Sequence, residues 1–293
     1  MKNLLKKSIV GAAIALAYSS GAFADATLSN GSITAVINNG GSFGVDPVYP
    51  LGAPGLSYLG VEFVNIDTPS SWWTLRGPST SLTSQYNSIP LGGSTTFGGG
   101  VASTTLAFGG LTFVQSTVLT AANQISFLVS FTNTGSKALT GLKYGVGIDP
   151  DQGGSGNNTT LNKILGQGTG SSVSAADTLY GTGMTVTLAN TSTAFPTGIA
   201  AYINPGDCCS AVNPATALGA AQSVGFSTLA DDSISLAYDI GTIGLGQTVS
   251  LGYNYTFSQT NPIPEPETYA MLLAGLGLMG VVARRRKQQS SAV

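Results

Sequence analysis

The chain of 293 residues contains no histidine and only two cysteines, Cys208 and Cys209, which are adjacent. The missing imidazole excludes a Ser-His-Asp triad, a Cys-His pair and every histidine-ligated metal site. Adjacent cysteines lie about 3.8 Å apart at Cα, closer than the usual disulfide range, so they do not link distant strands. A vicinal disulfide, two free thiols and bridges to another chain remain open, and an oxidising exterior favours oxidation.

Charge is also scarce, since charged residues make up 8% of the chain, against about 25% in an ordinary soluble protein. The cations gather at the two ends, within the first seven residues and at 284–287. Between Asp25 and Asp239, eleven carboxylates face four cations, a net charge of −7. This acidic balance argues against nucleic acid or an anionic membrane surface as a partner.

Residues 1–24 have the features of a secretory signal peptide. A basic start is followed by an apolar stretch from Ile9 to Tyr18 and by the small-x-small pattern Ala22-Phe23-Ala24. Signal peptidase is expected to cleave after Ala24. A buried first helix is the alternative.

The C-terminal region contains Thr268–Ala283, a run of sixteen residues without a charge. As a helix this run is about 24 Å long, which is short but sufficient to cross a bilayer with modest thinning. Four cations follow it directly and resist translocation: Arg284, Arg285, Arg286 and Lys287. The pattern predicts a single C-terminal transmembrane helix with the middle of the chain across the inner membrane, whereas a buried helix is the alternative.

The motif Pro264-Glu265-Pro266 precedes this apolar helix and the arginine cluster. In this order the three parts resemble the PEP-CTERM sorting signal of Gram-negative bacteria, here over residues 261–293. The resemblance implies recognition by exosortase, with Glu265 as the recognised acid and Pro264 and Pro266 as its rigid frame. It further implies a transient membrane anchor, removal of the helix, and delivery to the cell surface or extracellular matrix. The same tail has been labelled an ice-binding protein C-terminal domain, a label that describes a companion domain in some relatives.

Residues 25–260 show short apolar alternations separated by glycine-rich turns, which predict an all-β, antiparallel β-sandwich ectodomain. Three hairpins are expected, and further strands are expected at 33–37, 184–188 and 199–203. The hairpins join 125–131 to 142–148, 234–240 to 249–257, and 104–108 to 111–114 through Gly109-Gly110. Two of them also resemble supersandwich modules of carbohydrate-active enzymes, a resemblance that bears on fold alone.

Two polar groupings are candidate sites. The loop "DPDQGGSGNN" offers oxygen ligands for a Ca²⁺ ion from Asp149, Asp151, Asn157 and Asn158, and an ordinary turn is the alternative. Asp231-Asp232 is a weaker candidate for calcium, and we expect this pair to be a solvated turn. A glycosidase would need only two carboxylates, and the candidates are Glu62, Asp149, Asp151, Asp177, Asp207, Asp231 and Asp232.

Trp72 and Trp73 are the only tryptophans, and Arg76 follows them closely. Aromatic faces stack on sugar rings, so this group is a candidate glycan site. We favour burial over glycan contact, with one ring filling the core and the other exposed, because neighbouring residues of an extended chain point to opposite faces.

The sequence therefore favours an exported, non-enzymatic surface or matrix protein that is sorted by exosortase and associated with exopolysaccharide or biofilm. A secreted carbohydrate-binding or carbohydrate-cleaving β-sandwich protein is the alternative. No cofactor is expected apart from the possible Ca²⁺ ion. Ice binding would need flat ranks of threonine on adjacent strands, and the sequence shows only isolated groups at 185–187 and 191–193.

Overall fold

A computed structural model describes residues 25–44, 55–64, 71–85, 92–152, 158–193, 198–260, 273–276 and 279. The chain separates into two compact units, Met1–Gln259 and Thr260–Val293. The expected signal peptide with Ala24, the motif at 264–266 and the cations at 284–287 lie outside the described residues. Within the described ranges, no helix is long and apolar enough to cross a membrane. In the second unit, 273–276 and 279 are helical.

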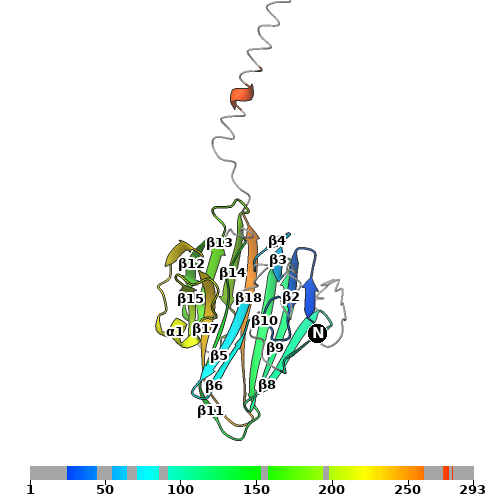
Figure 1. Ribbon diagram of the computed structural model, residues 1–293, viewed down its shortest axis with the longest axis vertical. Helices are drawn as coiled ribbons and strands as arrows, with labels where there is room; N and C mark the ends of the chain where they lie inside the picture. The colour runs from blue at the N-terminus through cyan, green and yellow to red at the C-terminus, as the bar shows by residue number, and fades with distance from the viewer. Residues whose placement is uncertain are drawn as a thin grey trace, which may run out of the picture. The chain divides into compact units, whose positions relative to one another are not determined.

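The first unit is built from antiparallel strands in three sheets, so the all-β prediction is confirmed (Figure 1). The large sheet has the order β16 (Ser227–Ala230), β12 (Thr160–Gly166), β13 (Ser172–Ala176), β14 (Met184–Asn190), β18 (Thr248–Gln259), β10 (Gln124–Asn133), β9 (Leu111–Ala121), β8 (Val101–Phe108), β7 (Ser94–Gly98). The middle sheet has the order β15 (Ile199–Asn204), β17 (Ser233–Ile243), β11 (Leu139–Ile148), β5 (Ser71–Gly77), β6 (Thr80–Ser84). The small sheet consists of β1 (Ala26–Ser29), β2 (Ile33–Ile37), β3 (Leu56–Tyr58) and β4 (Val61–Glu62).

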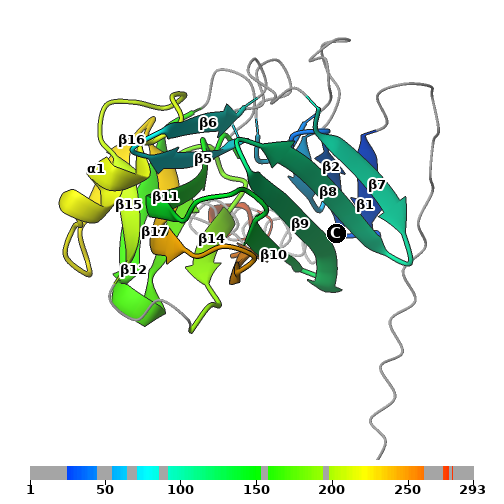
Figure 2. The same ribbon diagram turned by 90° about the horizontal axis from the view of Figure 1, so that it is seen from below.

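The middle and small sheets cover two halves of one face of the large sheet, as Figure 2 shows for β5 and β11 and for β1 and β2. Aromatic contacts join the layers. Trp73 of β5 stacks on Phe113 of β9 with ring centroids 4.7 Å apart, and Tyr58 of β3 stacks on Phe257 of β18 at 5.5 Å. The alternating apolar residues of each strand thus form one core between the sheets.

The expected hairpins have mixed outcomes. Strands β8 and β9 pair through Gly109 and Gly110, both with positive φ, which confirms that hairpin. The other two hairpins are wrong. Strand β10 pairs with β9 and β18 in the large sheet, whereas β11 pairs with β17 and β5 in the middle sheet. Likewise β17 and β18 lie in different sheets. Alternation identifies the buried face of a strand but not the strand that pairs with it. The connection from β10 to β11 and that from β17 to β18 each cross from one sheet to the other.

A short helix, α1 (Pro214–Gly219), was not expected from the sequence. Its N-cap is Asn213, whose side chain accepts a hydrogen bond from the Ala215 N–H, and Pro214 occupies the first turn. The helix covers the outer face of the middle sheet and forms a second apolar cluster with side chains from that face: Trp72, Tyr202, Val212, Ala217 and Ala237. The middle sheet is therefore apolar on both faces.

Candidate functional site

Five aspartates meet at one end of the middle sheet. Strand β11 ends there, β17 begins there and β15 ends there, because the register pairs Ile148 with Ile234 and Asn204 with Ser233. The segments beyond these strand ends carry the residues that we call the aspartate cluster: Asp149, Asp151, Asp207, Asp231 and Asp232. Antiparallel pairing thus brings together carboxylates that are far apart in the sequence.

The centre of the cluster is tight and buried. One carboxylate oxygen from each of Asp149, Asp151 and Asp231 lies within 4.8 Å of the other two. Asp149 is 2% exposed and Asp151 is 4% exposed. Burial, reinforced by the neighbouring carboxylates, raises the pKa of Asp149 to about 9. The ion pair found among the described residues joins Lys143 to Asp239. Since Asp239 does not belong to the aspartate cluster, this pair does not offset the negative charge of the cluster.

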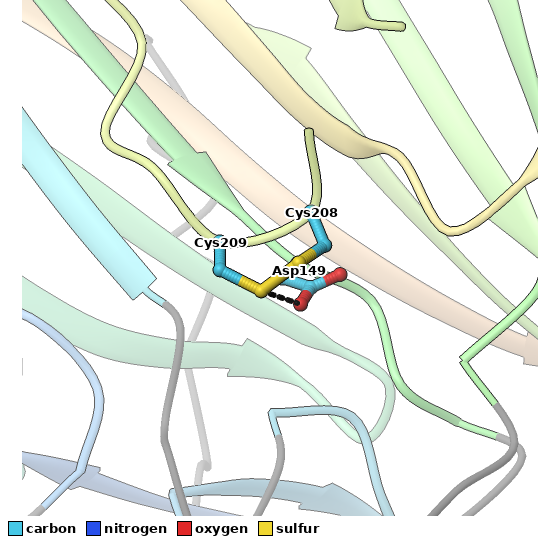
Figure 3. A group of neighbouring side chains, drawn as sticks. All are labelled: Asp149, Cys208 and Cys209. Atoms are coloured by element: carbon cyan, nitrogen blue, oxygen red, sulfur yellow. Dashed lines mark hydrogen bonds between the residues drawn. A yellow bond between two sulfur atoms is a disulfide. The ribbon is translucent and has the colours of Figure 1, made fainter. Parts of the chain in front are cut away.

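Cys208 and Cys209 form a vicinal disulfide beside the cluster, with their Cα atoms 3.7 Å apart. Figure 3 shows the Asp149 carboxyl against this disulfide, with Oδ2 3.6 Å from the Cys209 Sγ. A disulfide sulfur has no hydrogen, so this contact is a hydrogen bond only when Asp149 is protonated and donates. Because neither sulfur is a thiolate, the pair offers no soft metal ligand.

The structure tests the placement of the expected calcium ligands. Asp149 and Asp151 lie together, and Asn158 hydrogen-bonds with Asp231, whereas Asn157 lies outside the described residues. The interpretation of Asp231-Asp232 as a solvated turn is wrong for Asp232, whereas Asp231 is partly exposed. Asp232 is 1% exposed and accepts a hydrogen bond from the Gly206 N–H at 2.7 Å. The only sequence signal that could have predicted the burial of Asp232 was the position of the acidic pair directly before an apolar strand.

The expected glycan site does not form an open platform. Trp72 and Trp73 are each 1% exposed, so the expectation that one ring is exposed is wrong. Trp73 lies in the main core and donates from Nε1 to the Gly40 carbonyl, while Trp72 lies on the other face within the α1 cluster. Arg76 donates from its guanidinium to the Leu82 carbonyl at 2.6 Å. The helix explains the difference, because it covers the outer face of the middle sheet, on which Trp72 lies.

The remaining candidate carboxylates stabilise loops. Asp177 accepts hydrogen bonds from the Thr182 hydroxyl and from the backbone N–H groups of Leu179, Tyr180 and Thr182. Burial acts to raise the pKa of Asp177, but these bonds, the hydroxyl bond first, hold it below the usual value. Glu62 accepts backbone hydrogen bonds near the edge of the small sheet, and burial raises its pKa to about 7 against the effect of those bonds. Neither residue lies in the aspartate cluster as the structure defines it.

The outer face of the large sheet has a different character. Outward positions of β7, β8, β9, β10 and β18 form what we call the hydroxyl face: Ser94, Thr96, Ser103, Thr105, Thr112, Ser116, Thr120, Ser126, Ser130, Thr132, Thr248, Ser250, Thr256 and Ser258. Hydroxyls pair across strands, as Ser130 with Ser250 and Thr132 with Thr248, each at 2.8 Å. Among the described strand residues that face outward on this sheet, Lys163 of β12 is the one with a charge.

A shallow groove of about 640 Å³ runs over this face. It is lined by Val101, Ser116, Val118, Ser126, Phe127, Leu128, Thr191, Ser192, Thr193, Ser250, Leu251 and Gly252. Leu128 is 55% exposed, whereas Phe127 is 5% exposed and faces the core. The groove therefore offers hydroxyls and aliphatic carbon, with no carboxylate among its lining residues.

Comparison with known protein families concerns the tail. Residues 262–287 match the PEP-CTERM protein-sorting motif. The C-terminal segment is a PEP-CTERM sorting signal. This motif implies export and processing by exosortase, as the resemblance noted above suggested. The match covers the tail alone and leaves the function of the β-sandwich open.

No curated protein matches the chain by sequence. Among solved structures, similarity is found to a polysaccharide lyase (13% identity, TM-score 0.46, covering 83% of this chain and 34% of the lyase). It is also found to the heparan sulfate lyase HepC from Pedobacter heparinus (11% identity, TM-score 0.45, covering 89% of this chain and 39% of HepC). A putative aldose 1-epimerase from Escherichia coli K12 is similar as well (11% identity, TM-score 0.41, covering 82% of this chain and 100% of the epimerase). The chain spans only about a third of the length of the two lyases, and at these TM-scores no activity or ligand is transferred from any of these proteins.

Proposed function

We propose that the exported protein is a non-enzymatic component of the cell surface or extracellular matrix, and that its hydroxyl face contacts exopolysaccharide. The observation that carries this proposal is the combination of a PEP-CTERM signal with a large sheet face that is almost without charge. The sorting signal supports delivery of the protein to the exterior of the cell. The nearly uncharged hydroxyl face supports exopolysaccharide as the partner that the protein contacts there.

The chemistry of the hydroxyl face suits a hydrated sugar polymer. Serine and threonine hydroxyls both donate and accept hydrogen bonds, as sugar hydroxyls do. Contact with such a face requires no desolvation of ions, which is the expensive step in burying polar surface. Leu128, together with Val101 and Val118, adds aliphatic surface in the groove for the C–H groups of a sugar ring. Many weak contacts of this kind add up along a repeating polymer.

The arrangement of the carboxylates supports the non-enzymatic part of the proposal. Glycosidases hold their two carboxyl groups about 5 to 9.5 Å apart across an open cleft. In the aspartate cluster, oxygens of three carboxylates lie within 4.8 Å of one another, and Asp149 is 2% exposed. Asp149 and Asp151, at 2% and 4% exposed, leave little room for a sugar or an attacking water.

Binding to the producing strain's exopolysaccharide tests the proposed face. Exported protein recovered from the cells is cosedimented with the purified polymer, and Leu128→Glu is compared with the unaltered chain. A carboxylate in the groove has to be desolvated on contact, so we expect binding to weaken about tenfold or more. The matched control is Leu245→Glu, at a residue that is 60% exposed in the turn between β17 and β18, and it should bind normally.

Two results would overturn the proposal. Equal binding by Leu128→Glu and the unaltered chain would remove the hydroxyl face as the contact surface. Release of new reducing ends from the polymer would show an enzyme and favour the carbohydrate-cleaving alternative. Mass spectrometry of the recovered protein should also show both ends processed, and an intact chain in the cytosolic fraction would contradict export.

A further inference from the structure

Three separate segments of the chain deliver oxygen atoms to the centre of the aspartate cluster. Asp149 and Asp151 follow β11, Asn158 precedes β12, and Asp231 lies in the turn between β16 and β17. Ligand oxygens of the three aspartates are mutually within 4.8 Å. The Asn158 side chain joins them through its hydrogen bond with Asp231. A single small ion is thus within reach of groups from all three segments.

Three oxygens at this point, on Asp149, Asp231 and Asn158, lack the partners that buried acceptors normally have. Oδ1 of Asp149 is buried and has no hydrogen-bond partner among the described residues, in a side chain that is 2% exposed. Oδ1 of Asp231 and Oδ1 of Asn158 are buried and without such a partner in the same way. Buried polar atoms are almost always satisfied, and each exception needs an explanation, of which an ion is one. Here the unsatisfied atoms are all acceptors in one place, which points to a cation.

The ligand types select the class of cation. All the available groups are hard oxygens, because the neighbouring sulfurs are tied up in the disulfide. Hard oxygen sets bind Ca²⁺ or Mg²⁺ rather than zinc or copper. Ca²⁺ accepts irregular sets of carboxylate, amide and carbonyl oxygens, whereas Mg²⁺ demands near-ideal octahedral geometry and keeps several waters. Three carboxylates and an amide drawn from separate loops therefore favour Ca²⁺.

We propose that Asp149, Asp151, Asp231 and the side-chain oxygen of Asn158 bind a structural Ca²⁺ ion, with water or backbone oxygens completing its coordination. The ion joins the end of β11 to the segment before β12 and to the turn before β17. It also neutralises carboxylates that repel one another in its absence. Extracellular calcium modules bind in the range of about 10⁻⁴ to 10⁻³ M, so the site fills after export and stabilises the sandwich where the protein works.

Thermal unfolding of the chelator-treated exported protein tests this site. Addition of 5 mM CaCl₂, roughly five- to fiftyfold above the expected dissociation constant, should raise Tm by roughly 5 °C for a domain of this size. The same concentration of MgCl₂ should give a clearly smaller shift. Calorimetric titration with CaCl₂ should show one site per chain.

The variant Asp231→Asn separates ion binding from a merely structural role. It keeps the shape of the side chain and removes one like charge, so the Ca²⁺-free protein should be as stable as the unaltered chain or more stable. Its affinity for Ca²⁺ should nevertheless fall at least tenfold. Asp239→Asn is the matched control, because this carboxylate pairs with Lys143 away from the cluster, and it should keep the full response. No Tm shift with Ca²⁺, or a full shift in Asp231→Asn, would overturn the proposal.

Discussion

Replacing Trp72 by alanine tests whether this side chain belongs to the core or to a ligand site. The indole is 1% exposed and fills the cluster between the middle sheet and α1. Burying an aromatic side chain removes about 150 to 250 Å² from water, worth about 4 to 6 kcal/mol at 25 cal/mol per Å². Measured tryptophan-to-alanine costs run from about 3 to 5 kcal/mol. The Trp72 indole N–H has no partner among the described residues, so no hydrogen bond is lost, and we expect the lower part of that range, about 3 to 4 kcal/mol.

Urea unfolding at equilibrium measures this change. In a domain of this size the loss corresponds to a decrease in Tm of about 6 to 16 °C. The fluorescence of the variant should still report a buried indole, because Trp73 remains in the main core. Leu245→Ala, at a residue that is 60% exposed, is the control and should change stability by less than about 0.5 kcal/mol. A Trp72→Ala variant with unchanged stability and lost polysaccharide binding would refute the assignment of this ring to the core.

Two further predictions concern stability. Gly147→Ala should destabilise the protein by about 1 to 3 kcal/mol in urea unfolding, because the added Cβ would lie 2.6 Å from the Ile234 carbonyl and 2.7 Å from the Trp72 ring; unchanged stability would show that the neighbours yield freely. Burial raises the pKa of Glu62 from 4.5 to about 7, so its folded state binds the proton more tightly. The stability that this proton provides is fully present below about pH 4.5 and is lost as pH rises through 7, by about 3 kcal/mol in all. Subtracting the unfolding free energy of Glu62→Gln at each pH isolates this term, and a flat difference between pH 4.5 and 8 would contradict it.

The sequence predicted the strands better than their partners. Alternation placed Phe127 and Phe131 of β10 and Tyr144 and Val146 of β11 inward, and all four are buried. It did not distinguish a hairpin from a crossing between sheets, because both join two alternating strands through a polar connection. The β8 to β9 hairpin was identifiable because Gly109-Gly110 is a two-residue connection that leaves no length for a crossing.

The candidate site was predictable only in part. The acids that follow β11 were visible as a local group, whereas Asp231 lies some eighty residues further along and reaches them only because β17 pairs with β11. The sequence likewise predicted the burial of one tryptophan ring but not of both, and the second is Trp72. Its burial depends on α1, a helix of six residues that is too short to show a periodic pattern.

The sequence by itself determined what depends on composition and on contiguous pattern. These features are the absence of histidine chemistry, the sorting signal at 262–287, the all-β class and the impossibility of linking distant strands through Cys208 and Cys209. Only the tertiary structure decided which strands share a sheet, which aspartates share a buried site and which face of the large sheet is almost without charge. Those properties arise from contacts between segments far apart in the chain, and such contacts depend on how the sheets pack rather than on any local run of residues.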